Sequence, residues 1–256
     1  MNAAHWDLKI IEFGKESAPV VMLLHGGGLS WWNYREEALL LAETYHVVLP
    51  VLDGHADSAA PFTSIEENAR RLIRYIDEAL GGAVLAIGGL SLGGQILVEM
   101  LSQRNGICQY AVIESALTLP MALTHALIAP TFGMSYGLVK KRWFSKLQFK
   151  TLKIRRDLFE DYYRDTCKME KQNLIRVLQS NSSYKLKPGL ANTTAKALIL
   201  VGAREQKKMR RSAEMLHDIL RDSQLQILDQ LGHGECSLNH PRDYVKLLED
   251  LIRELD

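Results

Sequence analysis

Short apolar runs alternate along the chain with longer segments of helical periodicity. Apolar residues fill most positions of the runs at 20–24, 46–51, 83–87, 110–113, 197–201 and 225–228. Consecutive apolar positions are typical of strands buried on both faces of a parallel sheet. A further leading strand is predicted over 7–13.

Helical patterns fill the intervals between these runs, at 33–45, 64–80, 93–104, 206–221 and 240–254. The second of them begins with Ser64, a favourable N-cap, followed by two glutamates in the first turn. Alternation of strand and helix predicts right-handed βαβ units. The fold class is therefore α/β, with a doubly wound, mostly parallel sheet.

The alternation breaks once, between residues 118 and 190. No buried-strand pattern occurs there, only amphipathic helix-like sequence punctuated by Pro120, Pro130 and Pro188. The segment is too long for a loop in a compact domain. We therefore predict a core made of 1–117 and 191–256, with 118–190 inserted as a helical lid over the carboxyl ends of the strands. A lid there shapes a pocket and excludes water.

Composition limits the classes of protein that fit. With 256 residues, 47% of them hydrophobic, the chain forms one sizeable core without disulfide or metal cross-links. The net charge of +1 gives no sign of nucleic-acid binding. Cys108, Cys167 and Cys236 cannot all pair and are expected to be reduced thiols. The first 15 residues lack a signal-peptide pattern, and no apolar run reaches the ~18 residues of a spanning helix. A cytoplasmic location without stable membrane insertion is expected.

A nucleophilic serine is predicted on the turn after the run at 83–87. That run continues into Gly89-Leu-Ser91-Leu-Gly93, and a helical pattern follows at once. A Gly-x-Ser-x-Gly sequence between a strand and a helix is typical of a nucleophile elbow, in which the serine lies on a strained turn. Glycines are needed because neighbouring backbone passes close to that turn. The alternative is a glycine-rich turn with an incidental serine.

A second glycine-rich element, His25-Gly-Gly-Gly28, follows the run at 20–24. Acyl transfer needs backbone N–H donors directed at the developing oxyanion, and glycines let that backbone approach. The expected donors are Gly27 and Leu92, the residue after the nucleophile. A phosphate-binding loop with Asp53 as a ribose ligand is the alternative, but the third glycine of G-x-G-x-x-G is missing. No Gly-Lys-Ser/Thr occurs near Ser91 either.

The general base is predicted at His233, after the last apolar run and between two glycines. The chain order of serine, acid and histidine is the one expected for a nucleophile elbow. His233, Cys236 and His240 also have a loosely metal-like spacing, but no fourth ligand lies nearby. No metal and no organic cofactor is therefore predicted.

These motifs together resemble those of the α/β-hydrolase-fold serine hydrolases over essentially the whole chain. The resemblance rests on HGGG at 25–28, LDGHADS at 52–58, GLSLGG at 89–94 and GHGE at 232–235. The turn at 52–58 has Ala56 where this family commonly has glycine, and its implied role is structural. The family's lid insertion also falls where 118–190 lies.

The resemblance places the acid of the triad after the strand at 197–201, where this chain has Glu205. Glutamate can orient the imidazole and stabilise the imidazolium as aspartate does. Some members place the acid after the preceding strand, where Glu114 stands, and Asp229 is a third candidate. The alternative for each is a solvated surface carboxylate.

The implied activity is serine hydrolysis of a small-molecule carboxylic ester through an acyl-enzyme on Ser91. A serine nucleophile argues against the aspartate chemistry of haloalkane dehalogenases and epoxide hydrolases. C–C bond hydrolysis, lyase action and acyl transfer by the same triad stay open, because they differ in pocket shape and water handling. A non-enzymatic ligand sensor on the same fold also stays open.

The stretch 140–156 carries eight basic and no acidic residues, interleaved with aromatic and aliphatic ones. It would suit docking of an anionic carrier protein or a membrane surface. The simpler interpretation is a solvated face of lid helices whose apolar side caps the pocket. Met121, His125 and Met134 are candidates to line that pocket, although plain core packing fits their spacing equally well.

Overall fold

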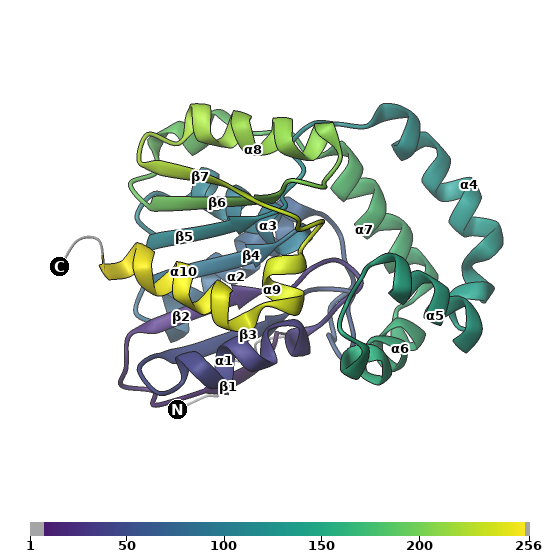
Figure 1. The fold of residues 1–256 in the computed structure, drawn as a ribbon, viewed down its shortest axis with the longest axis horizontal. Coiled ribbons are helices and arrows are strands. Elements are labelled where there is room, and N and C mark those ends of the chain that lie inside the picture. Colours follow the sequence, from purple (N-terminus) through teal and green to yellow (C-terminus); the bar gives the residue numbers. More distant parts are fainter. Residues whose placement is uncertain (1–7, 254–256) are drawn as a thin grey trace.

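The computed structural model describes residues 8–253, and within them one seven-stranded sheet has the order β1-β3-β2-β4-β5-β6-β7 (Figure 1). β1 is antiparallel to β3, and all other neighbours are parallel. The doubly wound, mostly parallel α/β sheet is thus confirmed. The predicted leading strand forms from Lys9, while Asp7 lies outside the described residues. The strands are β1 (Lys9–Phe13), β2 (Val20–Leu24), β3 (His46–Val51), β4 (Val84–Leu90), β5 (Cys108–Glu114), β6 (Lys196–Gly202) and β7 (Ser223–Leu228).

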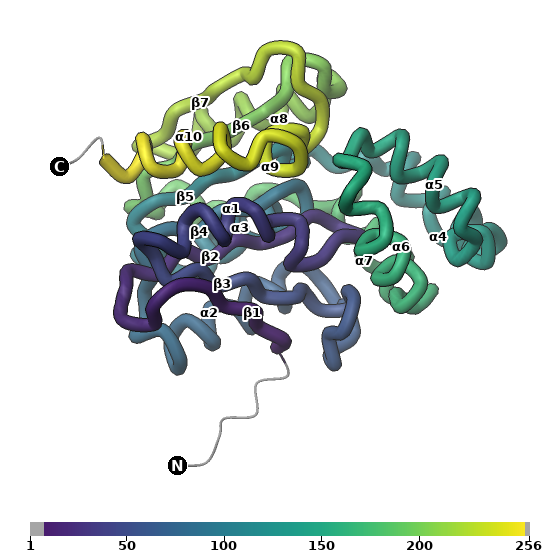
Figure 2. The backbone as a smooth tube through the Cα atoms, turned by 60° about the horizontal axis from the view of Figure 1, so that its bottom comes forward, coloured from purple at the N-terminus to yellow at the C-terminus, as the bar shows by residue number. Residues whose placement is uncertain are grey.

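Helices cover both faces of the sheet (Figures 1 and 2). Successive side chains of a strand point to opposite faces, so Val21 and Leu23 enter one hydrophobic core while Met22 and Leu24 enter the other. The core that contains Met22 packs against α2 (Ile65–Ala79), α3 (Leu92–Gln103) and α8 (Lys207–Ile219). The other core packs against η1 (Trp31–Tyr34), α1 (Arg35–Leu41), α9 (Glu235–Asn239) and α10 (Pro241–Arg253).

A helical segment lies between β5 and β6, beyond the edge of the sheet where β4, β5 and β6 end (Figures 1 and 2). Its helical content agrees with the expectation for 118–190. The division of the chain into core and lid, and the role of a lid, stay predictions. The segment consists of α4 (Ala122–Val139), α5 (Arg142–Thr151), η2 (Arg156–Leu158), α6 (Phe159–Lys168), α7 (Lys171–Ser183) and η3 (Pro188–Asn192).

Two local expectations are wrong, and one element was not expected. Pro130 does not separate helices but lies inside α4, which carries no Asp, Glu, Lys or Arg and has apolar residues on all sides rather than on one face. β7 is not buried on both faces, because it is the edge strand and Ile227 is 51% exposed. The short helix α9 was not expected before α10. No helix within residues 8–253 is long and apolar enough to cross a membrane.

Candidate active site

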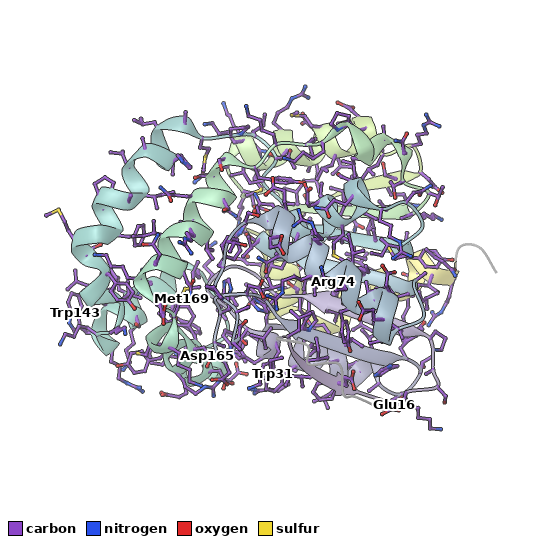
Figure 3. The ribbon with its side chains drawn as sticks, turned by 180° about the vertical axis from the view of Figure 1, so that it is seen from behind. Glu16, Trp31, Arg74, Trp143, Asp165 and Met169 are labelled. Carbon is purple, nitrogen blue, oxygen red and sulfur yellow. The ribbon has the colours of Figure 1, made fainter. Side chains whose placement is uncertain are left out.

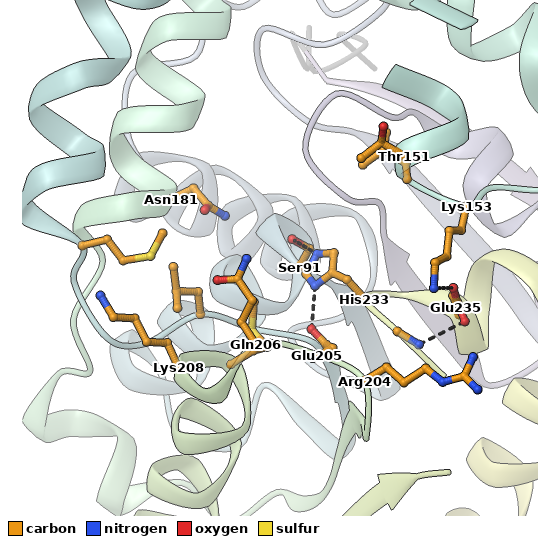
Figure 4. Close-up of a pocket in the computed structure, with 15 residues that line it drawn as sticks. Ser91, Thr151, Lys153, Asn181, Arg204, Glu205, Gln206, Lys208, His233 and Glu235 are labelled. Carbon is orange, nitrogen blue, oxygen red and sulfur yellow. Dashed lines mark hydrogen bonds and ion pairs between the residues drawn. The ribbon is translucent and has the colours of Figure 1, made fainter. Parts of the chain in front are cut away.

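The structure brings Ser91, His233 and Glu205 together at the carboxyl edge of the sheet (Figure 4). Ser91 follows β4, Glu205 lies on the loop after β6, and His233 lies on the loop after β7. His233 Nε2 is 3.0 Å from Ser91 Oγ, and its Nδ1 is 2.7 Å from Glu205 Oε2. With the ring proton on Nδ1, the imidazole donates to the carboxylate and accepts from the serine hydroxyl. The three side chains form one hydrogen-bonded line.

Ser91 occupies a strained turn. Its φ is 52°, in the left-handed region that non-glycine residues rarely adopt. A Cβ on Gly89 would lie 2.5 Å from the Gly93 carbonyl oxygen, and one on Gly93 would lie 2.1 Å from that of Leu24. Neither position can hold a side chain without displacing backbone. The sequence therefore folds as an elbow that presents the serine hydroxyl above the sheet.

Hydrogen bonds fix the carboxylate of Glu205 in place. Its Oε1 accepts from the Gly202 amide at 2.9 Å and from the Ser115 hydroxyl at 2.7 Å, while Oε2 accepts from His233. Burial raises the pKa of Glu205, but the hydrogen bond and charge of His233, together with the other donors, outweigh it and leave the pKa lowered. Glu205 therefore stays ionised beside the imidazole.

Ser115 belongs to this network and was not predicted. The residue is buried, has a φ of 55°, and accepts the Gly234 amide at 3.2 Å while donating to Glu205. It thus links the loop of the acid to the loop of His233. Its place directly after β5, at the same edge as the elbow, is the one signal in the sequence that could have found it.

The other two candidate acids lie elsewhere. Glu114 is buried and its Oε1 accepts the amides of Cys236 and Ser237 at 3.2 and 3.3 Å. Burial raises its pKa to about 7. Asp229 is exposed. Among the described residues, the carboxylate that forms a hydrogen bond with His233 is that of Glu205, and neither Glu114 nor Asp229 forms one.

Gly27 and Leu92 lie side by side next to Ser91. A Cβ on Gly27 would be 3.5 Å from the Leu92 Cβ, and Leu92 opens α3, so its N–H has no partner within the helix. His25 holds the glycine loop, because its Nδ1 donates to the Gly26 carbonyl at 2.8 Å and its Nε2 accepts from the Leu52 amide at 3.1 Å. Burial lowers the pKa of His25 to about 3, so the ring stays neutral.

The residues that a nucleotide-binding site or a metal site would use have other roles in the structure. Asp53 is buried and lies 3.5 Å from Arg71, so it is not presented to a ribose. His55, in the same turn, donates from Nδ1 to the Asp53 carbonyl, and Ala56 has a φ of 42°, which glycine would adopt without strain. Among the described residues, no group of three or more His, Cys, Asp or Glu could hold a metal ion.

A cavity of about 420 Å³ opens beside Ser91, between the core loops and the helical segment. Met121 lines it as expected, whereas Met134 is 91% exposed on α4 and lines no part of it. His125 is not among the lining residues either and contacts the Gln179 carbonyl oxygen on α7. The cavity wall combines apolar and cationic side chains, among them Leu117, Leu152, Met209, Lys153, Arg204 and Lys208.

An ion pair joins the helical segment to the histidine loop. Lys153, just after α5, lies 3.2 Å from Glu235 Oε1, and the Lys153 carbonyl accepts from Asn239 of α9. Glu235 also accepts the Gly232 amide, next to His233 (Figure 4). The wall of the cavity is thus tied to the loop that carries the imidazole.

Comparison with known proteins gives the same architecture. Solved structures that match include a thermophilic esterase from Thermogutta terrifontis (TM-score 0.79, 14% identity, 96% of this chain and 93% of that chain). An esterase from Exiguobacterium antarcticum matches with TM-score 0.80 and 18% identity, over 96% and 95% of the two chains. An enol-lactonase from Burkholderia xenovorans matches with TM-score 0.79 and 14% identity, over 96% of each chain. At such identities the likeness shows the fold.

No curated protein matches this chain in sequence. The model of the alpha/beta hydrolase family, in contrast, matches residues 21–247. Because that match covers most of the chain and agrees with the observed sheet, the protein belongs to the alpha/beta hydrolase family.

Proposed function

We propose that this hydrolase cleaves a small-molecule carboxylic ester through an acyl-enzyme on Ser91. His233 is the general base, Glu205 is the acid of the triad, and the amides of Gly27 and Leu92 form the oxyanion hole. The observation that carries the proposal is the continuous hydrogen-bonded line from Glu205 through His233 to Ser91, at 2.7 and 3.0 Å. This is the arrangement that activates a serine hydroxyl.

In acylation, Ser91 Oγ attacks the ester carbonyl carbon while His233 Nε2 takes the hydroxyl proton. The carbonyl oxygen becomes an oxyanion, which the Gly27 and Leu92 amides stabilise. The bond to the alkoxy group then breaks, and His233 returns its proton to the leaving alcohol. Glu205 stabilises the imidazolium throughout, because it stays ionised and keeps its hydrogen bond to Nδ1.

Deacylation repeats these steps with water as the nucleophile. His233 takes a proton from the water as its oxygen attacks the acyl carbon, and returns it to Ser91 Oγ as the acid leaves. This chemistry needs neither a metal nor an organic cofactor. Residues 118–190 act in this proposal as a lid over the cavity of about 420 Å³, which suits a small substrate. A cytoplasmic location stays a prediction.

The first test is hydrolysis of p-nitrophenyl esters of increasing acyl length by wild type and Ser91→Ala. Loss of the nucleophile should lower kcat on the order of 10⁶-fold without unfolding the protein. Ser17→Ala, an exposed serine in a loop far from the site in sequence, is the matched control and should keep full activity.

Two other results would each mean something different. A wild type that hydrolyses no ester but reacts with a fluorophosphonate at Ser91 has an active triad and another substrate class, such as a C–C bond or an acyl acceptor. A wild type that neither hydrolyses nor reacts is not a serine hydrolase, and ligand-dependent thermal stabilisation would then be expected of a sensor.

A further inference from the structure

The outer helix of the molecule, α4, exposes an uncharged apolar face. Its 18 residues include no Asp, Glu, Lys or Arg, and α4 lies at the edge farthest from the sheet (Figure 1). Leu123 is 76% exposed, Leu127 53%, Met134 91% and Leu138 41%. Their spacings of four, seven and four residues place them on one side of the helix. An exposed apolar stripe of this length marks an interaction surface.

The next helix, α5, packs against α4 and exposes cations and an aromatic ring of its own. On α5, Ser145 and Phe149 are buried, whereas Trp143 is 63% exposed and Leu147 is 58% exposed. Lys146 and Lys150 lie on the same exposed side, at helical spacing from Trp143 and Leu147. Figure 3 shows Trp143 at the outer edge of the molecule, away from the sheet.

Positive charge predominates around these apolar side chains. Lys141, at the junction of α4 and α5, is exposed, and residues 140–156 include no acidic residue. Arg142 is the cation in this stretch that pairs with a carboxylate of α6, Glu160. The exposed lysines Lys141, Lys146 and Lys150 form no ion pair among the described residues, although the charge of Lys146 helps to lower the pKa of Glu160. They therefore give the border of the apolar side chains a net positive charge.

We propose that the exposed side of these two helices, the α4–α5 surface, docks on an anionic lipid bilayer. This surface consists of Leu123, Leu127, Met134, Leu138, Lys141, Trp143, Lys146, Leu147 and Lys150. Leucine, methionine and tryptophan side chains enter the boundary between headgroups and acyl chains, and lysines bind the lipid phosphates. Insertion is shallow, because no described helix can span the bilayer.

Charge and shape favour a bilayer over the other possible occupants. A second copy of this chain would bring the two sets of lysines together, and like charges that face each other oppose association. An acidic protein would satisfy the lysines, but it would need a matching apolar strip of its own to cover the uncharged stripe of α4. An anionic bilayer supplies both the phosphates and the hydrocarbon.

The surface adjoins the cavity beside Ser91. Met121, which precedes α4, and Leu152, which follows α5, both line that cavity. In combination with the proposed function, this proximity implies that the enzyme takes acyl esters that are dissolved in the bilayer. Docking itself does not depend on ester hydrolysis and can be measured without turnover.

The test is co-sedimentation of the full chain with vesicles of phosphatidylcholine alone or mixed with phosphatidylglycerol. The protein should bind the mixed vesicles and not the neutral ones, and added salt should weaken binding. A lysine near an anionic surface contributes about fivefold in affinity, so changing Lys141, Lys146 and Lys150 to glutamine should weaken binding roughly hundredfold. The control changes Lys15, Lys185 and Lys246, which are exposed outside the surface, and should bind as wild type does.

A second variant tests the apolar part, with Leu127, Met134 and Trp143 changed to glutamine. It should also fail to bind the mixed vesicles. Both variants should hydrolyse a short water-soluble ester as wild type does, which separates this inference from the proposed function. Binding by either variant as tight as wild type would overturn the proposal. So would failure of the wild type to bind, or a dimer in solution that the apolar variant abolishes.

Discussion

Replacing Glu205 with glutamine should move the ring proton of His233 to the wrong nitrogen. The carboxylate Oε1 faces two donors, the Gly202 amide and the Ser115 hydroxyl. The glutamine oxygen must take that position, because an NH₂ group there would meet both donors. Its NH₂ group then faces His233 Nδ1, which is forced to accept. The proton moves to Nε2, and the imidazole can no longer accept from Ser91.

The expected loss follows from that tautomer. A triad in which the acid no longer orients the histidine loses about 10⁴ in kcat, or about 5 kcal/mol of transition-state stabilisation. KM should change little, because glutamine has the size and polarity of Glu205. The assay is steady-state hydrolysis of a p-nitrophenyl ester, with thermal unfolding to show that the variant is folded.

Glu114→Gln is the matched control, since the structure gives it no hydrogen bond to His233. The glutamine oxygen can keep the bonds from the Cys236 and Ser237 amides, so kcat should stay within about tenfold of wild type. The reasoning fails if Glu205→Gln also stays in that range. It fails equally if Glu114→Gln is the variant that loses activity.

Three further predictions concern the groups around the triad. Glu114→Gln should stabilise the fold at neutral pH, because burial raises the pKa of Glu114 from 4.5 to about 7. Below pH 4.5 Glu114 is protonated in both the folded and the unfolded state and does not change the free energy of unfolding, whereas above pH 7 its ionised form lowers that free energy by up to about 3 kcal/mol. Denaturant unfolding at both extremes checks this, and an equal gain at low pH would contradict it. Ser115→Ala should lower the unfolding free energy by about 1–3 kcal/mol and kcat roughly tenfold, because a buried amide loses its acceptor and the catalytic acid a donor; an unchanged kcat would refute the positioning role. Gly93→Ala should fail to fold, or unfold at much lower temperature, because its Cβ would lie 2.1 Å from the Leu24 carbonyl. Gly133→Ala, with open space in α4, should instead gain up to about 1 kcal/mol, and similar melting temperatures for the two would argue against the elbow packing.

The sequence predicts the parts of the site that depend on local backbone. Gly89, Ser91 and Gly93 form an elbow because of contacts within one strand–turn–helix unit, so their spacing is sufficient. Glu205 and Glu114 could not be separated in this way. Glu114 ends β5 and Glu205 follows β6, so both lie at the same edge of the sheet. The orientation of each side chain, set by tertiary packing, decides which one reaches His233.

Other residues could not be placed because their environment is set by distant parts of the chain. Ser115 is an isolated serine after a strand and matches no motif, yet it joins two loops that lie 90 and 119 residues further along the chain. Apolar character predicts burial, which is wrong at Met134 and Ile227. The first lies on an outer helix and the second on an edge strand, and neither position can be read from a local pattern.

The most direct test of the central claim is reaction of the purified protein with a fluorophosphonate, followed by peptide mass spectrometry. A serine activated by His233 should form one covalent adduct, on Ser91, and the adduct should be absent from Ser91→Ala and strongly slowed in Glu205→Gln. Absence of any adduct on folded wild type, or an adduct on another residue, would contradict the account.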